Sequence, residues 1–308
     1  MSEAAEVGEP TSRFSSCLTA DGKWFIERVG EDEHCFRIDK VYFQGRTAFQ
    51  ELAIIGTREY GTMLIIDGET QSAEDDEYIY HEALVHPAMV AHPAPQRVLI
   101  IGGGEGATLR ETLRHPTVSH VTMVDIDGEM INLAKQYLND WHRGAFNDPR
   151  VFLKICDGLE FLRNTPERFD VAIIDVCDYG EGTAVEGLYN QTFFAAIRSV
   201  LAASGILVVQ AGELGACEHD DHVGLRKLIS KVFPTPISYS TYVESFWSEW
   251  SYILAGGVDP AIAMADPARI DLELASKKLD KQLRFYDGAT HCRMFHLPKN
   301  VRAALAPA

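Results

Sequence analysis

A run of apolar residues followed by four glycines within five positions, at residues 98–113, constrains the fold of this chain more than any other stretch. The run Val98-Leu99-Ile100-Ile101 is typical of a strand that is buried on both faces. The residues that follow are four glycines and then a helix-like stretch: Gly102, Gly103, Gly104, Gly106 and residues 107–113. Glycine adopts positive φ and lets the backbone approach a ligand closely. The order of strand, glycine turn and helix therefore predicts a unit that offers free backbone N–H groups to a nucleotide.

The spacing of the glycines leaves three interpretations open. Gly102-x-Gly104-x-x-Ala107 fits a dinucleotide fingerprint, and Gly102-x-Gly104-x-Gly106 fits S-adenosyl-type cofactors. A tight strand-to-helix turn without a ligand is the third interpretation. Glu105 favours the S-adenosyl type, because a carboxylate in the turn repels a pyrophosphate but suits a sulfonium or an amine.

Four further apolar runs follow the turn in βα alternation. They span residues 120–124, 151–155, 171–174 and 205–210. The first four strands of the series end in acidic residues or glycines, and such ends share one crevice in an open parallel sheet. The pattern predicts an α/β fold over residues 76–308, with a Rossmann-like, mostly parallel sheet and helices on both faces.

Asp125 ends the strand predicted at 120–124, about 20 positions after the glycine turn. An acidic residue at this place can accept hydrogen bonds from ribose hydroxyls. The structural alternative for an acidic residue here is a helix N-cap, a role that Asp127 fits.

The stretch before residue 76 predicts a smaller, separate domain. Residues 1–19 are expected to be a frayed tail, and residues 20–75 a small N-terminal β domain. Its strand-like runs are residues 24–27, 35–38, 49–55 and 62–66. Asp67-Gly68 is a favoured two-residue hairpin turn, which predicts a returning strand at 69–73. A helix over 78–91 then opens the larger domain.

Composition narrows the classes of function. The 308 residues are 46% hydrophobic, enough for one large and one small domain. The net charge of −17 argues against nucleic-acid binding and mildly favours a cationic substrate, although any soluble acidic protein has such a charge. No apolar run approaches a membrane span, and the first residues lack a secretory signal. The six cysteines are scattered, which predicts reduced thiols, a cytoplasmic location and no metal site.

Several separated motifs carry a resemblance to a known family. They are IDGETQSAE at 66–74, DEYIYHEALVHP at 76–87, GGGEG at 102–106, Asp125-Ile126-Asp127, Asp157-Gly158, Asp175-x-x-Asp178, and LRFY at 283–286 with His291, Phe295, Leu297 and Pro298. With these motifs the chain resembles the polyamine aminopropyltransferases, the spermidine synthase family, and most closely the thermospermine synthase branch. The resemblance runs from about residue 24 to 305 and implies the S-adenosylmethionine-dependent transferase type of Rossmann-like fold.

The resemblance implies transfer of the aminopropyl group of decarboxylated S-adenosylmethionine to an amine of spermidine or putrescine, releasing methylthioadenosine. Asp175 would be the base. The implied donor-binding residues are Gln50, Gly102, Gly104, Glu105, Asp125, Ile126, Asp157 and Gly158, of which Asp125 would bind the ribose and Asp157 and Gly158 the adenine. The implied acceptor-binding residues are Trp24, Gln71, Tyr80, His81, Asp178 and Gln210. Without the resemblance, His81 would be interpreted as a hydrogen-bonded histidine of the core or surface. A homodimer or homotetramer is implied, without a tightly bound cofactor.

The chemistry of the implied reaction calls for carboxylates, apart from the resemblance. Alkylammonium groups have a pKa near ~10.4, so at neutral pH a proton occupies the lone pair that must attack. A carboxylate beside the amine can bind it, orient it and accept that proton. Asp175 and Asp178, three positions apart, can divide this work, and the reaction needs no metal.

Two departures from the family lie on the acceptor side. Tyr179 and Glu244 stand where relatives have proline, whereas the donor-side motifs are nearly intact. An alternative is therefore a divergent transferase or cyclase that uses intact S-adenosylmethionine and has a repurposed acceptor pocket. A third class is a non-catalytic donor-binding protein, or an oxidoreductase that uses the glycine turn for a dinucleotide.

Overall fold

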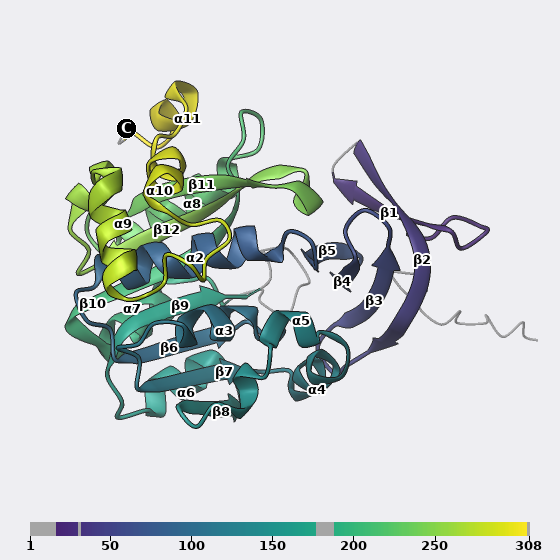
Figure 1. Cartoon of the computed structure of the whole chain (residues 1–308), viewed down its shortest axis with the longest axis horizontal. Coiled ribbons are helices and arrows are strands. Elements are labelled where there is room, and N and C mark those ends of the chain that lie inside the picture. Colours follow the sequence, from purple (N-terminus) through teal and green to yellow (C-terminus); the bar gives the residue numbers. More distant parts are fainter. Residues whose placement is uncertain (1–16, 30–31, 177–187, 307–308) are drawn as a thin grey trace, which may run out of the picture. The chain divides into compact units, whose positions relative to one another are not determined.

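The computed structural model describes residues 17–29, 32–176 and 188–306, which form two compact units that divide between Asp75 and Asp76 (Figure 1). Asp178 and Tyr179 lie outside the described residues. Every helix in the described ranges is too short or too polar to cross a lipid bilayer.

The first unit is a five-stranded antiparallel sheet whose strands follow one another in chain order. The strands are β1 (Trp24–Val29), β2 (Asp32–Arg46), β3 (Glu51–Thr57), β4 (Thr62–Ile66) and β5 (Glu69–Ala73). The predicted hairpin turn is confirmed, because Asp67 and Gly68 join β4 to β5 with φ of 51° and 88°. Thr70 on β5 donates from its N–H and its hydroxyl to the buried carboxylate of Glu27 on β1, both at 2.7 Å, which joins the first and last strands.

Two strands of this unit differ from their predicted bounds. β2 covers 15 residues and contains register shifts, whereas only residues 35–38 were expected. β3 begins at Glu51 rather than at Phe49. The reason is local, because the Thr47 hydroxyl accepts from the N–H groups of Phe49 and Gln50 and holds them in a turn.

The second unit contains a seven-stranded sheet in the order β11-β12-β10-β9-β6-β7-β8. The strands are β6 (Arg97–Gly102), β7 (His120–Asp125), β8 (Val151–Ile155), β9 (Phe169–Asp175), β10 (Leu201–Glu213), β11 (Ile237–Val243) and β12 (Ser248–Gly256). The five neighbouring strands β8, β7, β6, β9 and β10 pair in parallel, in that order. β12 is antiparallel to both β10 and β11. The predicted α/β fold with a mostly parallel sheet is therefore confirmed.

Helices cover both faces of this sheet. The α-helices are α2 (Glu77–Ala91), α3 (Ala107–Leu113), α4 (Gly128–Tyr137), α5 (Asn139–His142), α6 (Gly158–Asn164), α7 (Gln191–Val200), α8 (Asp220–Ser230), α9 (Pro267–Ser276), α10 (Gly288–Phe295) and α11 (Lys299–Ala304). Short 3-10 helices are η1 (Ala145–Asn147), η2 (Glu244–Phe246) and η3 (Pro260–Met264). One core cluster joins the sheet to α2, α3, α9 and α10, and a second joins it to α6, α7 and α8.

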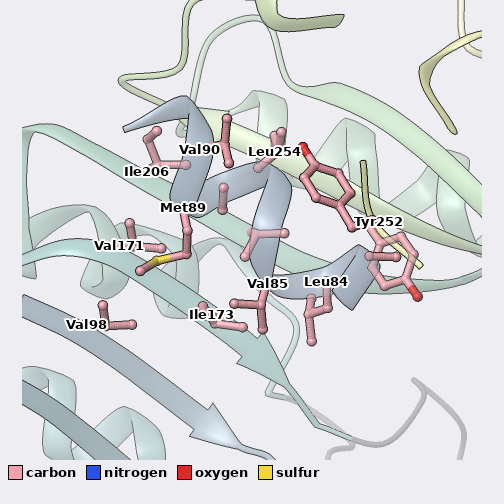
Figure 2. Packing of buried hydrophobic residues seen from close by; sticks show 14 of the residues in the cluster. Leu84, Val85, Met89, Val90, Val98, Val171, Ile173, Ile206, Tyr252 and Leu254 are labelled. Carbon is pink, nitrogen blue, oxygen red and sulfur yellow. The ribbon is translucent and has the colours of Figure 1, made fainter. Parts of the chain in front are cut away.

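Apolar side chains point alternately to the two faces of the central strands, which explains why helices cover both faces of the sheet. On β9, Val171 and Ile173 belong to the first cluster and Ala172 and Ile174 to the second. Figure 2 shows α2 against this sheet, with Met89 and other apolar side chains of the helix pointing toward strand residues such as Val171 and Ile173. Both faces of β9 are therefore removed from water. The same holds for β6, whose apolar run predicted it, because Val98 and Ile100 belong to the first cluster and Leu99 and Ile101 to the second.

α2 passes through a proline without ending. Pro87 has no N–H to donate to the carbonyl of Ala83 one turn earlier. The hydroxyl of Tyr239 on β11 donates to that carbonyl at 3.0 Å instead. A tertiary contact thus satisfies the backbone group that proline leaves open, and the helix extends to Ala91 as predicted.

The sheet topology collects several strand ends at one edge. β6 and β9 are parallel neighbours, yet β7 and β8 extend the sheet to one side and β10 to the other. In this arrangement the carboxyl ends of β6 and β9 form the switch point at which open α/β sheets bind ligands. Gly102 at the end of β6 is in register with Asp175 at the end of β9.

Candidate active site

Asp175 lies at the switch point and its carboxylate is held by two hydroxyl groups. Tyr80 on α2 donates to Oδ1 at 2.7 Å, and Thr108 on α3 donates to Oδ2 at 2.6 Å. The backbone of Asp175 is also fixed, since its carbonyl accepts from the N–H of Gly103 at 2.7 Å. Because a carboxylate offers about four lone-pair sites, two hydroxyl donors leave acceptor capacity for a further partner.

The glycine turn lies against the ends of two strands, which explains two of its glycines. Gly102 has φ of +83°, and a Cβ there would lie 2.1 Å from the carbonyl oxygen of Asp175. A Cβ on Gly104 would lie 3.0 Å from Oδ2 of Asp125. Glycine at these positions lets the turn approach both strand ends.

Asp125 and Asp127 divide the two roles that were considered for the acidic end of β7. Asp127 caps α4 and accepts from the N–H groups of Glu129 and Met130. Asp125 instead accepts from the N–H of Asp127 at 2.8 Å. Burial, reinforced by the negative charges of Asp127 and Asp175, raises the pKa of the Asp125 carboxyl to about 6.

The next strand ends in a helix cap. Asp157 is exposed, and its carboxylate accepts from the N–H of Glu160 at 2.7 Å at the start of α6. A Cβ on Gly158 would lie 3.0 Å from the side chain of Ile101, so glycine keeps α6 close to β6. Ile126, beside Asp125, is 37% exposed.

Glu105 and His81 form a buried ion pair. The Nε2 atom of His81 lies 2.5 Å from Oε1 of Glu105, and its Nδ1 atom lies 2.9 Å from Oε2 of Glu77. Burial opposes the charged imidazole, but the two carboxylates outweigh it and raise the pKa of His81 well above 6.5. Burial also raises the pKa of Glu105; His81 opposes this and the charge of Asp175 adds to it. Residues from α2 and the glycine turn are thereby joined.

Gln210 on β10 supports the end of the neighbouring strand. Its Nε2 donates to the carbonyl of Val176 at 2.7 Å, and its Oε1 accepts from the N–H of Gly212 at 3.2 Å. Val176 directly follows Asp175, so the Gln210 amide holds the chain next to the carboxylate. Gln210 is 3% exposed.

The remaining predicted site residues lie elsewhere in the described chain or outside it. Trp24 begins β1 and is 41% exposed, Gln50 precedes β3 and is buried, and Gln71 lies within β5. These three belong to the first unit. Asp178 lies outside the described residues. Within the second unit, the structure joins Tyr80 to Asp175 and His81 to Glu105, and sets the glycine turn against Asp125 and Asp175.

The site also contains residues that sequence reasoning missed. Thr108 on α3 contacts Asp175, Glu77 on α2 contacts His81, and Arg110 on α3 contacts Glu77. Phe246 on η2 packs edge-on against Tyr80 at a centroid distance of 6.0 Å. The spacing of Glu77 and His81, four residues apart on a helix, was a usable signal. Nothing local marked the others, because they meet the site only through tertiary packing.

Chemically, the site is a set of carboxylates around a glycine turn. The negative charge of Asp175 raises the pKa of both Asp125 and Glu105, so the three groups act on one another. Such a site attracts cations and can accept a proton at Asp175. Among the described residues, no group of three or more His, Cys, Asp or Glu side chains is arranged to hold a metal ion.

Comparison with known proteins gives consistent matches over almost the whole chain. The family model described as Spermine/spermidine synthase domain matches residues 77–263, and that described as Spermidine synthase tetramerisation domain matches residues 23–74. The polyamine aminopropyltransferase of Aeropyrum pernix is 40% identical over 286 residues, which are 92% of this chain and 90% of that protein. Polyamine aminopropyltransferase 2 of Hyperthermus butylicus is 41% identical over 286 residues and 92% of each chain. A crystal structure of spermidine synthase in complex with the transition state analogue AdoDATO has a TM-score of 0.83 at 32% identity, covering 92% of this chain and 94% of that one.

Proposed function

Because this chain belongs to the spermine/spermidine synthase family, we propose that it transfers the aminopropyl group of decarboxylated S-adenosylmethionine to an amine of a polyamine and releases methylthioadenosine. The observation that carries the proposal is the Asp175 carboxylate, held by Tyr80 and Thr108 opposite the glycine turn. This arrangement lies within the residues that match the synthase domain.

The residues supply the groups that such a transfer needs. The amine nitrogen attacks the aminopropyl carbon next to sulfur, the new C–N bond forms, and the C–S bond breaks with its electron pair going to sulfur. The sulfonium thereby becomes a neutral thioether. Asp175 accepts the proton that the amine loses, and the Tyr80 and Thr108 hydroxyls hold its carboxylate in place. Glu105 and Asp175 lie close enough for their charges to act on one another, and two neighbouring carboxylates favour a cationic substrate over a neutral one.

For the donor, we propose that Asp125 binds the ribose hydroxyls while Asp157 and Gly158 contact the adenine, with Ile126 against the ring. Gly102 and Gly104 allow the backbone of the turn to approach, and Glu105 and Gln50 bind the aminopropyl end. The exposed carboxylate of Asp157, next to the helix start at Gly158, supports the adenine contact.

For the acceptor, we propose a polyamine that is bound by Gln71, Tyr80, His81, Asp178 and Gln210, with Trp24 at the far end of the groove. The identity of the amine, spermidine or putrescine, stays a prediction, as does the likeness to the thermospermine branch. Tyr179 and Glu244, which replace family prolines, are the positions at which this chain can differ from its relatives in acceptor choice.

The family match also bears on assembly. The model that matches residues 23–74 is described as a tetramerisation domain, which supports a homo-oligomer, and we propose a dimer or tetramer. We propose a cytoplasmic location, in line with the five free thiols among the described residues.

Mass spectrometry of the reaction products tests the proposed function. The purified protein is incubated with either decarboxylated or intact S-adenosylmethionine and a panel of amines. We expect a polyamine that has gained one aminopropyl group, together with methylthioadenosine, only with the decarboxylated donor. A product formed only with intact S-adenosylmethionine would favour the divergent transferase instead, and NAD(P)H consumption would favour an oxidoreductase.

A further inference from the structure

A buried row of charged side chains leads away from the glycine turn within the second unit. It runs from Glu105 to His81, then to Glu77 on α2 and to Arg110 on α3. Glu77 accepts from Arg110 with both oxygens, from Nη1 at 3.0 Å and from Nη2 at 2.9 Å. Each of these side chains is buried, and only Glu105 lies in the turn itself.

The partners of its two ring nitrogens favour a charged His81. A neutral imidazole has one N–H donor, whereas the imidazolium has two. His81 has a carboxylate on each of its two nitrogens, at 2.5 Å and 2.9 Å. Nδ1 lies 2.7 Å from the carbonyl of Glu77 and 2.9 Å from its carboxylate, while Nε2 lies within ion-pair distance of Glu105. A protonated ring directs an N–H from each nitrogen toward one of these groups, so an imidazolium between two carboxylates fits the geometry.

Arg110 is held so firmly that it can serve as the fixed end of the row. Besides Glu77, its guanidinium donates to Oε1 of Glu111 at 2.7 Å and to the carbonyls of Asp140 and Trp141. These carbonyls belong to α5, so α2, α3 and α5 converge on one guanidinium. A buried carboxylate such as Glu77 stays ionised only with such a partner.

The charge of His81 affects the protonation of Glu105, the member of the row that lies in the turn. Burial raises the pKa of Glu105, and the nearby charge of Asp175 acts in the same direction. A neutral His81 would leave Glu105 prone to protonation, and a neutral Glu105 would lose its attraction for a cation. His81 lies against one oxygen, Oε1, and we assign the other oxygen, Oε2, to the substrate.

We propose that Glu77 and Arg110 are positioning residues that act through His81, holding its ring against Glu105 so that Glu105 presents an ionised carboxylate of fixed orientation to the cationic end of the donor. The inference rests on the proposed function and gives His81 a role that needs no contact with the acceptor. The groups that face His81 are Glu77 and Tyr80 on α2, Glu105 in the turn, and, one contact farther, Arg110 on α3 and Asp175 on β9.

The first test is a titration of His81 by NMR on the full-length protein, which needs no substrate. The His81 signal is assigned by its loss in a His81→Gln variant. We expect the wild-type ring to titrate well above the ordinary value of 6.5, and Glu77→Gln to lower its pKa by about one unit or more, because one of the two carboxylate charges is lost. A wild-type His81 that titrates near the ordinary value of 6.5 would overturn the proposal.

The second readout is kinetic. In Glu77→Gln, we expect KM for decarboxylated S-adenosylmethionine to rise about tenfold, with a smaller change in kcat, and the alkaline limb of kcat/KM to move to lower pH. Arg110→Lys, which keeps the charge but loses the two-point contact, should give the same changes at smaller size and provides a second route if Glu77→Gln does not fold.

Glu82→Gln is the matched control. Glu82 lies on the same helix and is equally buried, but its carboxylate accepts from the N–H groups of Arg284, Phe285 and Tyr286. Its loss should lower Tm without moving the His81 pKa or the alkaline limb. Equal effects of Glu77→Gln and Glu82→Gln would reduce the row to a purely structural role. Wild-type protein that alkylates no amine would contradict the proposed function instead, while the NMR titration would still report on the row.

Discussion

The hydroxyl of Tyr80 on α2 donates a hydrogen bond of 2.7 Å to Oδ1 of Asp175 at the end of β9, joining residues that are 95 positions apart in the chain. Thr108 on α3 binds the other oxygen at 2.6 Å. The carboxylate is therefore oriented before substrate binds, so little reorganisation is needed when a proton arrives.

Tyr80→Phe removes one of these donors while keeping the ring that packs against Phe246 and Tyr252. A hydrogen bond to a charged group contributes about 1.5–3 kcal/mol, so we expect kcat to fall about 10- to 100-fold. Affinity for methylthioadenosine, measured by calorimetry, should stay close to wild type. Thr108→Val, nearly equal in shape, is the comparison for the second oxygen. A Tyr80→Phe enzyme with unchanged kcat would show that the hydrogen bond does not serve the reaction.

Nucleoside binding should depend on pH through Asp125. Its pKa is raised to about 6 by burial and neighbouring charge. Ribose hydroxyls donate to the ionised form, so the complex binds fewer protons than the free protein, and affinity falls as pH drops below 6. We expect the dissociation constant of methylthioadenosine to rise about tenfold for each pH unit below that value.

Two Asp125 variants check this pH dependence by calorimetry. Asp125→Ala should weaken binding of methylthioadenosine by about 1.5–3 kcal/mol at neutral pH. Asp125→Asn should bind weakly at every pH, because its side chain does not titrate. Wild-type affinity that stays constant through pH 6 would mean that Asp125 does not contact the ribose.

The glycine turn offers a pair of substitutions with opposite expectations. Gly102→Ala combines a left-handed backbone with a Cβ that would meet the Asp175 carbonyl at 2.1 Å, so it should cost more than about 2 kcal/mol of stability. Gly104→Ala places its Cβ 3.0 Å from the Asp125 carboxylate and should weaken methylthioadenosine binding with little change in Tm. Thermal denaturation and calorimetry separate the two. Equal Tm values for both variants would contradict this account of the turn.

Much of the fold could be predicted because local sequence patterns mark where its strands and helices begin and end. The strands at 62–66 and 151–155 and the helix at 107–113 agree with prediction residue for residue, since apolar runs, Asp67-Gly68 and the glycine turn mark their ends. The antiparallel pair β11 and β12 was not predicted. Its residues mix serine, tyrosine and glutamate on strands that are largely buried against α2, α8 and α10, so no clean alternation appears.

Only the site residues that belong to a sequence motif could be predicted. The glycine turn and the acidic strand ends at Asp125 and Asp175 were identified from sequence. Thr108 and Arg110 were missed, because a threonine or arginine on a helix gives no sign that it will meet a strand end or a buried glutamate. Those contacts arise from helix packing against the sheet, which only the structure shows.

Acceptor choice should favour a longer amine. Phe246 on η2 packs on Tyr80, one of the proposed acceptor-binding residues, and the exposed Glu244 belongs to the same short helix. A triamine carries an additional ammonium group that such a carboxylate can pair. We therefore expect spermidine to be used better than putrescine in competition kinetics, and Glu244→Gln to reduce that preference. Preference for putrescine, unchanged in Glu244→Gln, would exclude this role for Glu244.

Asp175 is the group that we propose accepts the proton from the attacking amine. Asp175→Asn keeps the size of the side chain but removes its ability to accept a proton. The direct measurement is the single-turnover rate of methylthioadenosine formation from bound decarboxylated S-adenosylmethionine and saturating polyamine. We expect this rate to fall about a hundredfold or more in Asp175→Asn, with methylthioadenosine affinity and Tm retained. A rate close to wild type in the folded variant would contradict the mechanism.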